Sequence, residues 1–156
     1  MRLLFVCTGN TCRSPLAEAL GRRIASERAL GAIVTASAGT DAGEGAPASD
    51  GSLLVGLEHQ LDLSAHRARP LTRELVAEAD LVLAMGPHHL ELIESLGGER
   101  KAHLLSSYAT RNASQSPVSD PFGGDLADYR ATFAELQSLL ARVFDRVVAE
   151  RETGAA

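Results

Sequence analysis

The chain alternates short apolar runs with longer helical patterns, and this alternation restricts the fold more than any other feature of the sequence. The first run, residues 2–6, is followed by Gly9 and Asn10, as expected for a buried strand that enters a tight loop. Ser14 and Pro15 then supply a capping hydroxyl and a residue suited to the first helical position. The N-terminal segment is therefore predicted to form a strand, a loop and a helix.

The same alternation continues along the chain. Further strands are predicted at residues 32–37, 81–85 and 101–105, and further helices over residues 53–61, 72–79, 87–96 and 125–147. The helix over 53–61 is expected to bury an apolar face of Leu53, Leu54, Leu57 and Leu61. Strands joined by helices run parallel through right-handed crossovers. We expect an α/β fold, with a small four-stranded parallel sheet flanked by helices on both faces. One domain of residues 1–156 is expected, with a frayed tail from residue 152.

The composition argues against several classes of protein. A formal net charge of −5 does not provide the basic surface that binding to nucleic acid needs. We find no signal peptide and no run of about 20 apolar residues, which argues against a membrane segment. The two cysteines, Cys7 and Cys12, are too few and too close for a disulfide framework. Reduced thiols and a cytoplasmic location are expected.

Residues 7–14 have the spacing of a phosphate-binding loop at the carboxyl end of the first strand, where parallel sheets bind ligands. Five residues separate Cys7 from Arg13, so backbone N–H groups can turn inward and form an anion site before a helix. The Arg13 guanidinium can hold two phosphoryl oxygens. The same positive groups stabilise a thiolate at Cys7, which would attack phosphorus and form a phosphocysteine intermediate. The residues predicted to bind phosphate are Thr8, Gly9, Asn10, Thr11, Cys12, Arg13 and Ser14.

Two other interpretations of this loop are weaker. A lone cysteine at a strand end is usually an inert buried thiol. Arg13 and Ser14, in a strand-loop-helix context, favour the nucleophile instead. A nucleotide-binding loop requires Gly-Lys-Ser/Thr, which is absent, and no lysine precedes Lys101.

The chain carries Cys-x5-Arg-Ser-Pro at residues 7–15 and Asp-Pro at residues 120–121. Both motifs, in this order, resemble the signature of the low-molecular-weight protein tyrosine phosphatase family, and the resemblance runs over nearly the whole chain. It implies that Asp120 is the general acid, carried by the loop of residues 106–124. Apart from the resemblance, this Asp-Pro would be taken as an ordinary turn. No cofactor is expected.

The resemblance also implies supports for the phosphate loop. Ser14 would donate its hydroxyl to the Cys7 sulfur. Asn10, in a left-handed backbone conformation, would be held through Ser37 and His66. Apart from the resemblance, His66 would be taken as a surface histidine. The other histidines show no metal-ligand spacing with either cysteine and are expected to be structural or solvated: His59, His88, His89 and His103.

Cys12 shares the loop with Cys7, near enough for a disulfide once the loop is curled. The resemblance implies that this pair converts peroxide damage into a recoverable disulfide. The alternative, in which Cys12 is a small thiol that packs the loop, stays open.

Three substrates compete within the resemblance. Arsenate reductases of this fold that use thioredoxin need further cysteines after Cys12, and the chain has none. Tyrosine phosphatases of the family tend to carry a bulky aliphatic residue at the position of Thr11 and two adjacent aromatics after Asp-Pro, where this chain has only Phe122. Thr11 and the Asp-Pro-Phe-Gly-Gly run resemble the protein-arginine phosphatase branch. Phosphoarginine is therefore favoured over phosphotyrosine as the substrate.

The expected partner is a phosphorylated protein, and the enzyme is expected to be a monomer. A remote alternative is a non-catalytic module that senses an oxyanion or the redox state through the same loop. Asp120 argues against that module, because a carboxylate aimed at an anion weakens its binding.

Overall fold

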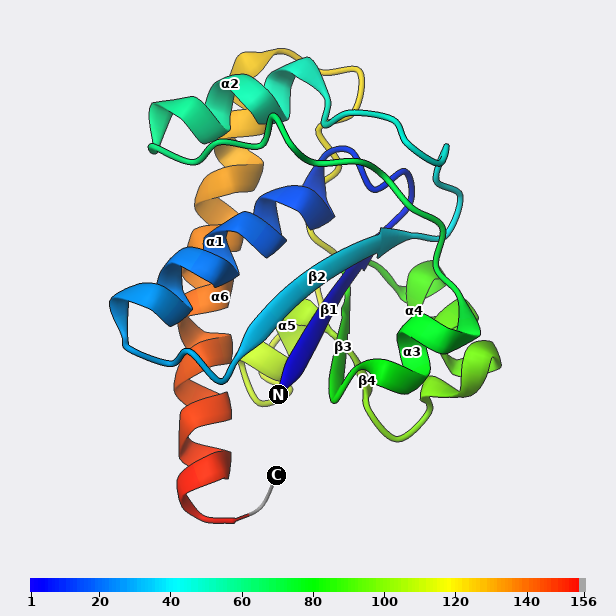
Figure 1. Ribbon diagram of the computed structural model, residues 1–156, viewed down its shortest axis with the longest axis vertical. Coiled ribbons are helices and arrows are strands. Elements are labelled where there is room, and N and C mark those ends of the chain that lie inside the picture. The colour runs from blue at the N-terminus through cyan, green and yellow to red at the C-terminus, as the bar shows by residue number, and fades with distance from the viewer. Residues whose placement is uncertain (155–156) are drawn as a thin grey trace.

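The computed structural model describes residues 1–154 and contains one parallel sheet of four strands (Figure 1). The strand order is β2-β1-β3-β4. The strands are β1 (Arg2–Cys7), β2 (Val34–Gly39), β3 (Leu81–Ala84) and β4 (Ala102–Leu104). The helices are α1 (Arg13–Glu27), α2 (Asp50–Glu58), α3 (Arg73–Glu78), α4 (Pro87–Ile93), α5 (Leu105–Ala109) and α6 (Leu126–Glu152), and a single π-helical turn, η1 (Glu94–Gly98), follows α4.

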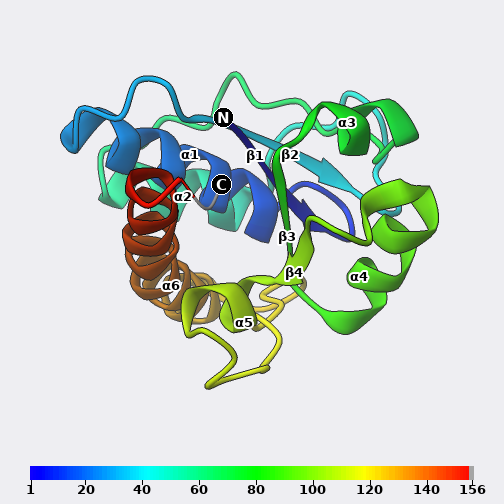
Figure 2. The ribbon, with the colours of Figure 1, turned by 90° about the horizontal axis from the view of Figure 1, so that it is seen from below.

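Both faces of the sheet are buried. Leu3 and Phe5 belong to one apolar cluster with residues of α1, α5 and α6, whereas Leu4 and Val6 belong to a second cluster with residues of α3 and α4. Figures 1 and 2 show α1 and α6 on one side of the sheet and α3 and α4 on the other. This double burial explains why the strands are continuous apolar runs. The predicted α/β fold, with helices on both faces of a four-stranded parallel sheet, is confirmed.

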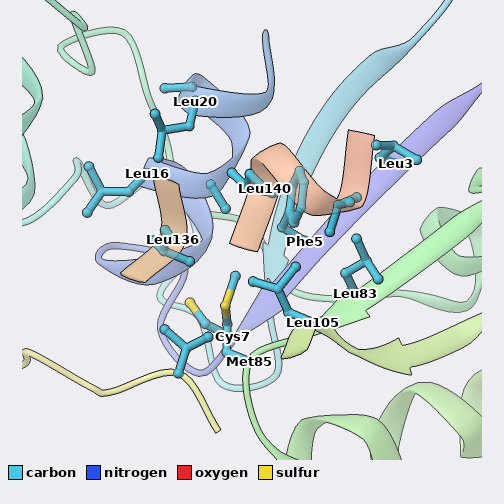
Figure 3. Packing of buried hydrophobic residues seen from close by; sticks show 14 of the residues in the cluster. Leu3, Phe5, Cys7, Leu16, Leu20, Leu83, Met85, Leu105, Leu136 and Leu140 are labelled. Atoms are coloured by element: carbon cyan, nitrogen blue, oxygen red, sulfur yellow. The ribbon is translucent and has the colours of Figure 1, made fainter. Parts of the chain in front are cut away.

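The larger cluster holds the candidate nucleophile at its edge. Leu16 of α1 and Leu136 of α6 pack in the same cluster as Phe5 of β1 (Figure 3). Cys7, the last residue of β1, lies beside Met85 at the end of this group. A fully packed strand therefore positions the thiol.

The helix predicted over residues 53–61 begins and ends three residues earlier, as α2, and packs through other residues. Leu54 and Leu57 are exposed, so the prediction that they belong to a buried apolar face is wrong. The side of α2 that carries Gly51 packs against α6 instead. A Cβ at Gly51 would lie 2.4 Å from the Tyr129 ring. This close approach turns the two leucines outward.

Two predicted boundaries are shifted. α1 begins at Arg13, and no side chain caps its N terminus, so the prediction that Ser14 is a cap is wrong. The Ser14 hydroxyl is hydrogen-bonded to the Cys7 sulfur instead, at 2.9 Å. β2 begins two residues later than the predicted 32–37 and continues to Gly39, because its pairing with β1 extends to Cys7 opposite Gly39.

The loop predicted over residues 106–124 starts within a short helix, since α5 ends at Ala109. The Val118 N–H donates to the Met85 carbonyl (2.8 Å), which ties the loop to the carboxyl end of β3. α6 ends at Glu152, and the last two residues of the predicted frayed tail lie outside the described residues. No helix within residues 1–154 has the length and apolar composition needed to cross a membrane.

Candidate active site

The loop between β1 and α1 forms the floor of a cavity of about 180 Å³ at the carboxyl edge of the sheet. The loop is anchored by the segment after β2: the Thr40 and Asp41 N–H groups donate to the carbonyls of Cys7 and Thr8, each at 2.9 Å. The loop is thereby fixed to the neighbouring strand. The cavity is lined by Cys7, Thr8, Gly9, Thr11, Cys12, Arg13, Asp120 and Phe122.

The Cys7 sulfur has one close hydroxyl neighbour, Ser14 Oγ at 2.9 Å. Asn10 Nδ2 donates to Ser14 Oγ at 2.8 Å and to Ser37 Oγ at 3.0 Å. The amide nitrogen can only donate, so Ser14 accepts from Asn10 and keeps its own hydrogen for the sulfur. Ser37 in turn donates to Glu18 Oε1 at 2.6 Å. This one-way chain places a hydrogen-bond donor next to the Cys7 sulfur.

Asn10 is fully buried and adopts a left-handed backbone conformation with φ of 56°. His66 Nε2 donates to its backbone carbonyl at 2.7 Å, and the Arg69 N–H donates to its Oδ1 at 3.0 Å. Ser37 and His66 thus both contact Asn10, from β2 and from the segment that follows α2. Four contacts through side chain and backbone hold the residue in a conformation that most side chains avoid.

Arg13 and Asp120 meet at the cavity from opposite sides. Arg13 is 5% exposed, its Nη1 donates to the Val118 carbonyl at 3.2 Å, and its Nη2 lies 3.5 Å from Asp120 Oδ2. Among residues 1–154, its Nε is buried without a hydrogen-bond partner. Asp120 is half exposed, and its Oδ1 accepts the Phe122 N–H at 3.1 Å. A buried guanidinium and a solvated carboxyl group therefore border one cavity.

The sulfur of Cys12, within the loop, has polar neighbours. Its sulfur donates to Ser49 Oγ at 3.3 Å and lies 3.5 Å from the Tyr129 hydroxyl. Ser49 also caps α2, and Tyr129 belongs to α6, so these contacts join the loop to two helices. Cys7 and Cys12 are both free thiols in this structure.

Two residues at the site were not predicted there. His89 is fully buried, and its Nε2 lies 2.8 Å from Thr8 Oγ1, although it was expected to be structural or solvated. Tyr129 fits the apolar stripe of α6, but its hydroxyl reaches Cys12. A signal for His89 existed, because it lies in the first turn of the helix that follows a predicted strand, at the ligand-binding edge of the sheet. His59 stacks on Phe133 with ring centroids 4.0 Å apart.

The arrangement has parts that phosphoryl transfer can use: a sulfur with a hydrogen-bond donor beside it, a buried guanidinium at the end of the loop, and a carboxyl group at the mouth. A family model described as low molecular weight phosphotyrosine protein phosphatase matches residues 2–153.

Individual relatives agree with that match. The chain is 40% identical over 153 residues to a protein-arginine-phosphatase of Bacillus subtilis, which covers 97% of this chain and 99% of the relative. It is 33% identical to the low molecular weight protein-tyrosine-phosphatase PtpB of Staphylococcus haemolyticus, over 92% of this chain and 97% of the relative. A solved structure of the YwlE arginine phosphatase, a C7S mutant with a phosphorylated active-site serine, superposes with a TM-score of 0.91 at 39% identity and covers 97% of this chain and 99% of that one. The chain belongs to the low molecular weight phosphotyrosine protein phosphatase family.

Proposed function

We propose that the protein hydrolyses phosphoarginine residues of phosphorylated proteins through a phosphocysteine intermediate. The observation that carries the choice of substrate is Thr11 in the wall of the cavity. Its hydroxyl can accept a hydrogen bond from a guanidinium N–H, whereas an aryl ring favours an apolar wall. Phe122, 77% exposed, adds one aromatic surface for the flat guanidinium. The 40% identity to a protein-arginine-phosphatase supports the same substrate.

In the first step, the Cys7 thiolate attacks phosphorus, the S–P bond forms and the P–N bond to the guanidino group breaks. Asp120 gives its proton to the leaving nitrogen, so arginine departs as its guanidinium cation. Arg13 and the loop N–H groups hold the three equatorial oxygens. The phosphorylated active-site serine in the YwlE mutant supports an intermediate of this kind.

In the second step, Asp120, now a carboxylate, accepts a proton from water, and the water oxygen attacks phosphorus. The S–P bond breaks, and inorganic phosphate leaves with the Cys7 thiolate restored. The Ser14 hydroxyl, 2.9 Å from the sulfur, stabilises the departing thiolate. The enzyme thus returns to its starting state without a cofactor.

Phosphotyrosine is the alternative substrate. The description of the family and the tyrosine-phosphatase relative favour it, because both name that activity. Thr11 and the single aromatic residue after Asp-Pro argue for phosphoarginine. The remote alternative, a sensor without turnover, is disfavoured by Asp120, which points a carboxyl group at the anion site.

The Thr11→Ile variant tests the choice of substrate. Isoleucine keeps the branching at Cβ, so the loop should still form. The lost hydroxyl and the added apolar surface should move the ratio of kcat/KM from phosphoarginine toward phosphotyrosine by about 10- to 200-fold. Matched phosphoarginine and phosphotyrosine peptides measure this ratio. Thr153→Ile, at the exposed residue that follows α6, is the control. If the parent enzyme prefers phosphotyrosine, or if the ratio does not change in Thr11→Ile, the substrate is phosphotyrosine and not phosphoarginine.

Three further proposals accompany this one. A disulfide between Cys7 and Cys12 under peroxide is supported by their shared loop. A cytoplasmic location is supported by the need for a reduced nucleophile. The enzyme is proposed to act as a monomer, without nucleic acid.

A further inference from the structure

The side chain of Thr8 is held from α4. Thr8 directly follows Cys7 and lines the cavity, and its Oγ1 lies 2.8 Å from His89 Nε2. Its backbone carbonyl accepts the Asp41 N–H at 2.9 Å. The backbone of Thr8 is therefore fixed by the segment after β2, and its hydroxyl by the helix after β3.

His89 is neutral near pH 7. The side chain is fully buried, and this burial lowers the pKa of His89 to about 4. The nearby charges of His88 and Arg13 lower this pKa further, and Asp120 opposes them. A neutral imidazole carries one proton, so only one of its two nitrogens can donate.

The surroundings of the ring indicate which nitrogen carries that proton. Among residues 1–154, His89 Nδ1 is buried and has no hydrogen-bond partner. A buried N–H without an acceptor is rarer in proteins than an acceptor without a donor. The proton therefore belongs on Nε2, which donates to Thr8 Oγ1. The Thr8 hydroxyl then keeps its own hydrogen for a different acceptor.

Within a bound substrate, only the phosphoryl group can accept a hydrogen bond from the Thr8 hydroxyl. A guanidinium has donors only, whereas a phosphoryl group has several acceptor oxygens. Resting on the proposed phosphatase function, we infer that His89 is a positioning residue, which holds the Thr8 hydroxyl so that it donates to an oxygen of the bound phosphoryl group. The contribution is separate from the selection attributed to Thr11, because phosphoarginine and phosphotyrosine share the phosphoryl group.

Binding of inorganic phosphate to the purified protein, measured by calorimetry, tests this inference without turnover. Thr8→Val and His89→Phe should each weaken the affinity by about 10- to 100-fold, the value of a hydrogen bond to a charged group. The double variant should be no weaker than either single variant, because both remove the same contact. His89→Gln, which can present an N–H, should retain more affinity than His89→Phe. His88→Phe, at the exposed neighbour whose ring lies tilted against that of His89, is the matched control.

The proton itself can be observed in the wild-type protein. Nitrogen-15 NMR of the imidazole should show the Nε2–H tautomer at pH 7, and the Nδ1–H tautomer would overturn the inference even if His89→Phe does not fold. Unchanged phosphate affinity in Thr8→Val, or additive losses in the double variant, would also overturn it. If the variants follow the expected pattern but phosphoarginine and phosphotyrosine peptides are not hydrolysed, the proposed function fails and the contact to phosphate stands.

Discussion

Asp120 stands at the mouth of the cavity with one oxygen 3.5 Å from Arg13 and the other on the Phe122 N–H. A phosphoryl group that enters the cavity competes with Asp120 for the guanidinium. In the proposed mechanism the carboxyl group is then free to face the leaving group, as a general acid must. The contact with Arg13 thus holds the carboxyl group of Asp120, the proposed general acid, at the mouth of the cavity.

Asp120→Ala should lower kcat/KM on a phosphoarginine peptide by about 10²- to 10⁴-fold, because the leaving nitrogen receives no proton. The loss should shrink for p-nitrophenyl phosphate, whose leaving group departs as an anion. Steady-state kinetics on both substrates measures the difference. Asp62→Ala, exposed and away from the cavity, is the control. Equal losses on good and poor leaving groups would contradict the role of Asp120 as an acid.

At the scale of elements, the end of β2 supports the phosphate loop. Gly39 pairs with Cys7 across the sheet, and a Cβ at this position would lie 2.4 Å from the Thr8 carbonyl oxygen and 2.9 Å from the Asn10 nitrogen. Both atoms belong to the backbone, so they cannot rotate away. Glycine is required here because the loop lies directly against the strand.

Gly39→Ala should therefore displace the loop and lower the free energy of unfolding by about 1–3 kcal/mol. Urea unfolding measures the stability, and the affinity for phosphate should fall with it, since the displaced segment is the proposed phosphate-binding loop. Gly43→Ala is a close control, because a Cβ at Gly43 meets no atom within 4 Å. If Gly39→Ala matches Gly43→Ala in stability and phosphate affinity, β2 does not shape the loop.

For the whole molecule, His89 makes stability depend on pH. Burial lowers its pKa from 6.5 to about 4 in the folded state, so the unfolded chain binds more protons between these values. The stabilisation is present above pH 6.5 and is lost as the pH falls toward 4, by up to about 3 kcal/mol. The change between pH 6.5 and 4.5 should be smaller in His89→Phe than in the wild-type protein. Urea unfolding at each pH measures the free energy of unfolding. Equal losses in the wild-type protein and in His89→Phe would contradict a buried neutral His89.

Local patterns in the sequence predicted the strand, the loop and the first helix, because a buried run, Gly-Asn and Ser-Pro act on neighbouring residues. They could not predict the contact between Cys12 and Tyr129, which lie 117 residues apart and meet only because α6 packs beside the loop. The same holds for Thr8 and His89, which the adjacency of β1 and β3 brings together. Leu54 and Leu57 had the spacing of a buried face, but the contact of Gly51 with Tyr129 turned them outward.

In the proposed reaction, a phosphoryl group passes from arginine to the Cys7 sulfur. Rapid-quench mass spectrometry after mixing the enzyme with a phosphoarginine peptide tests it most directly. The expected result is a gain of one phosphoryl group on the tryptic peptide that contains Cys7, formed and lost on the timescale of turnover. Asp120→Ala should prolong the signal with an aryl phosphate, because the water is no longer activated. Turnover without this adduct, or an adduct on another residue, would contradict the account.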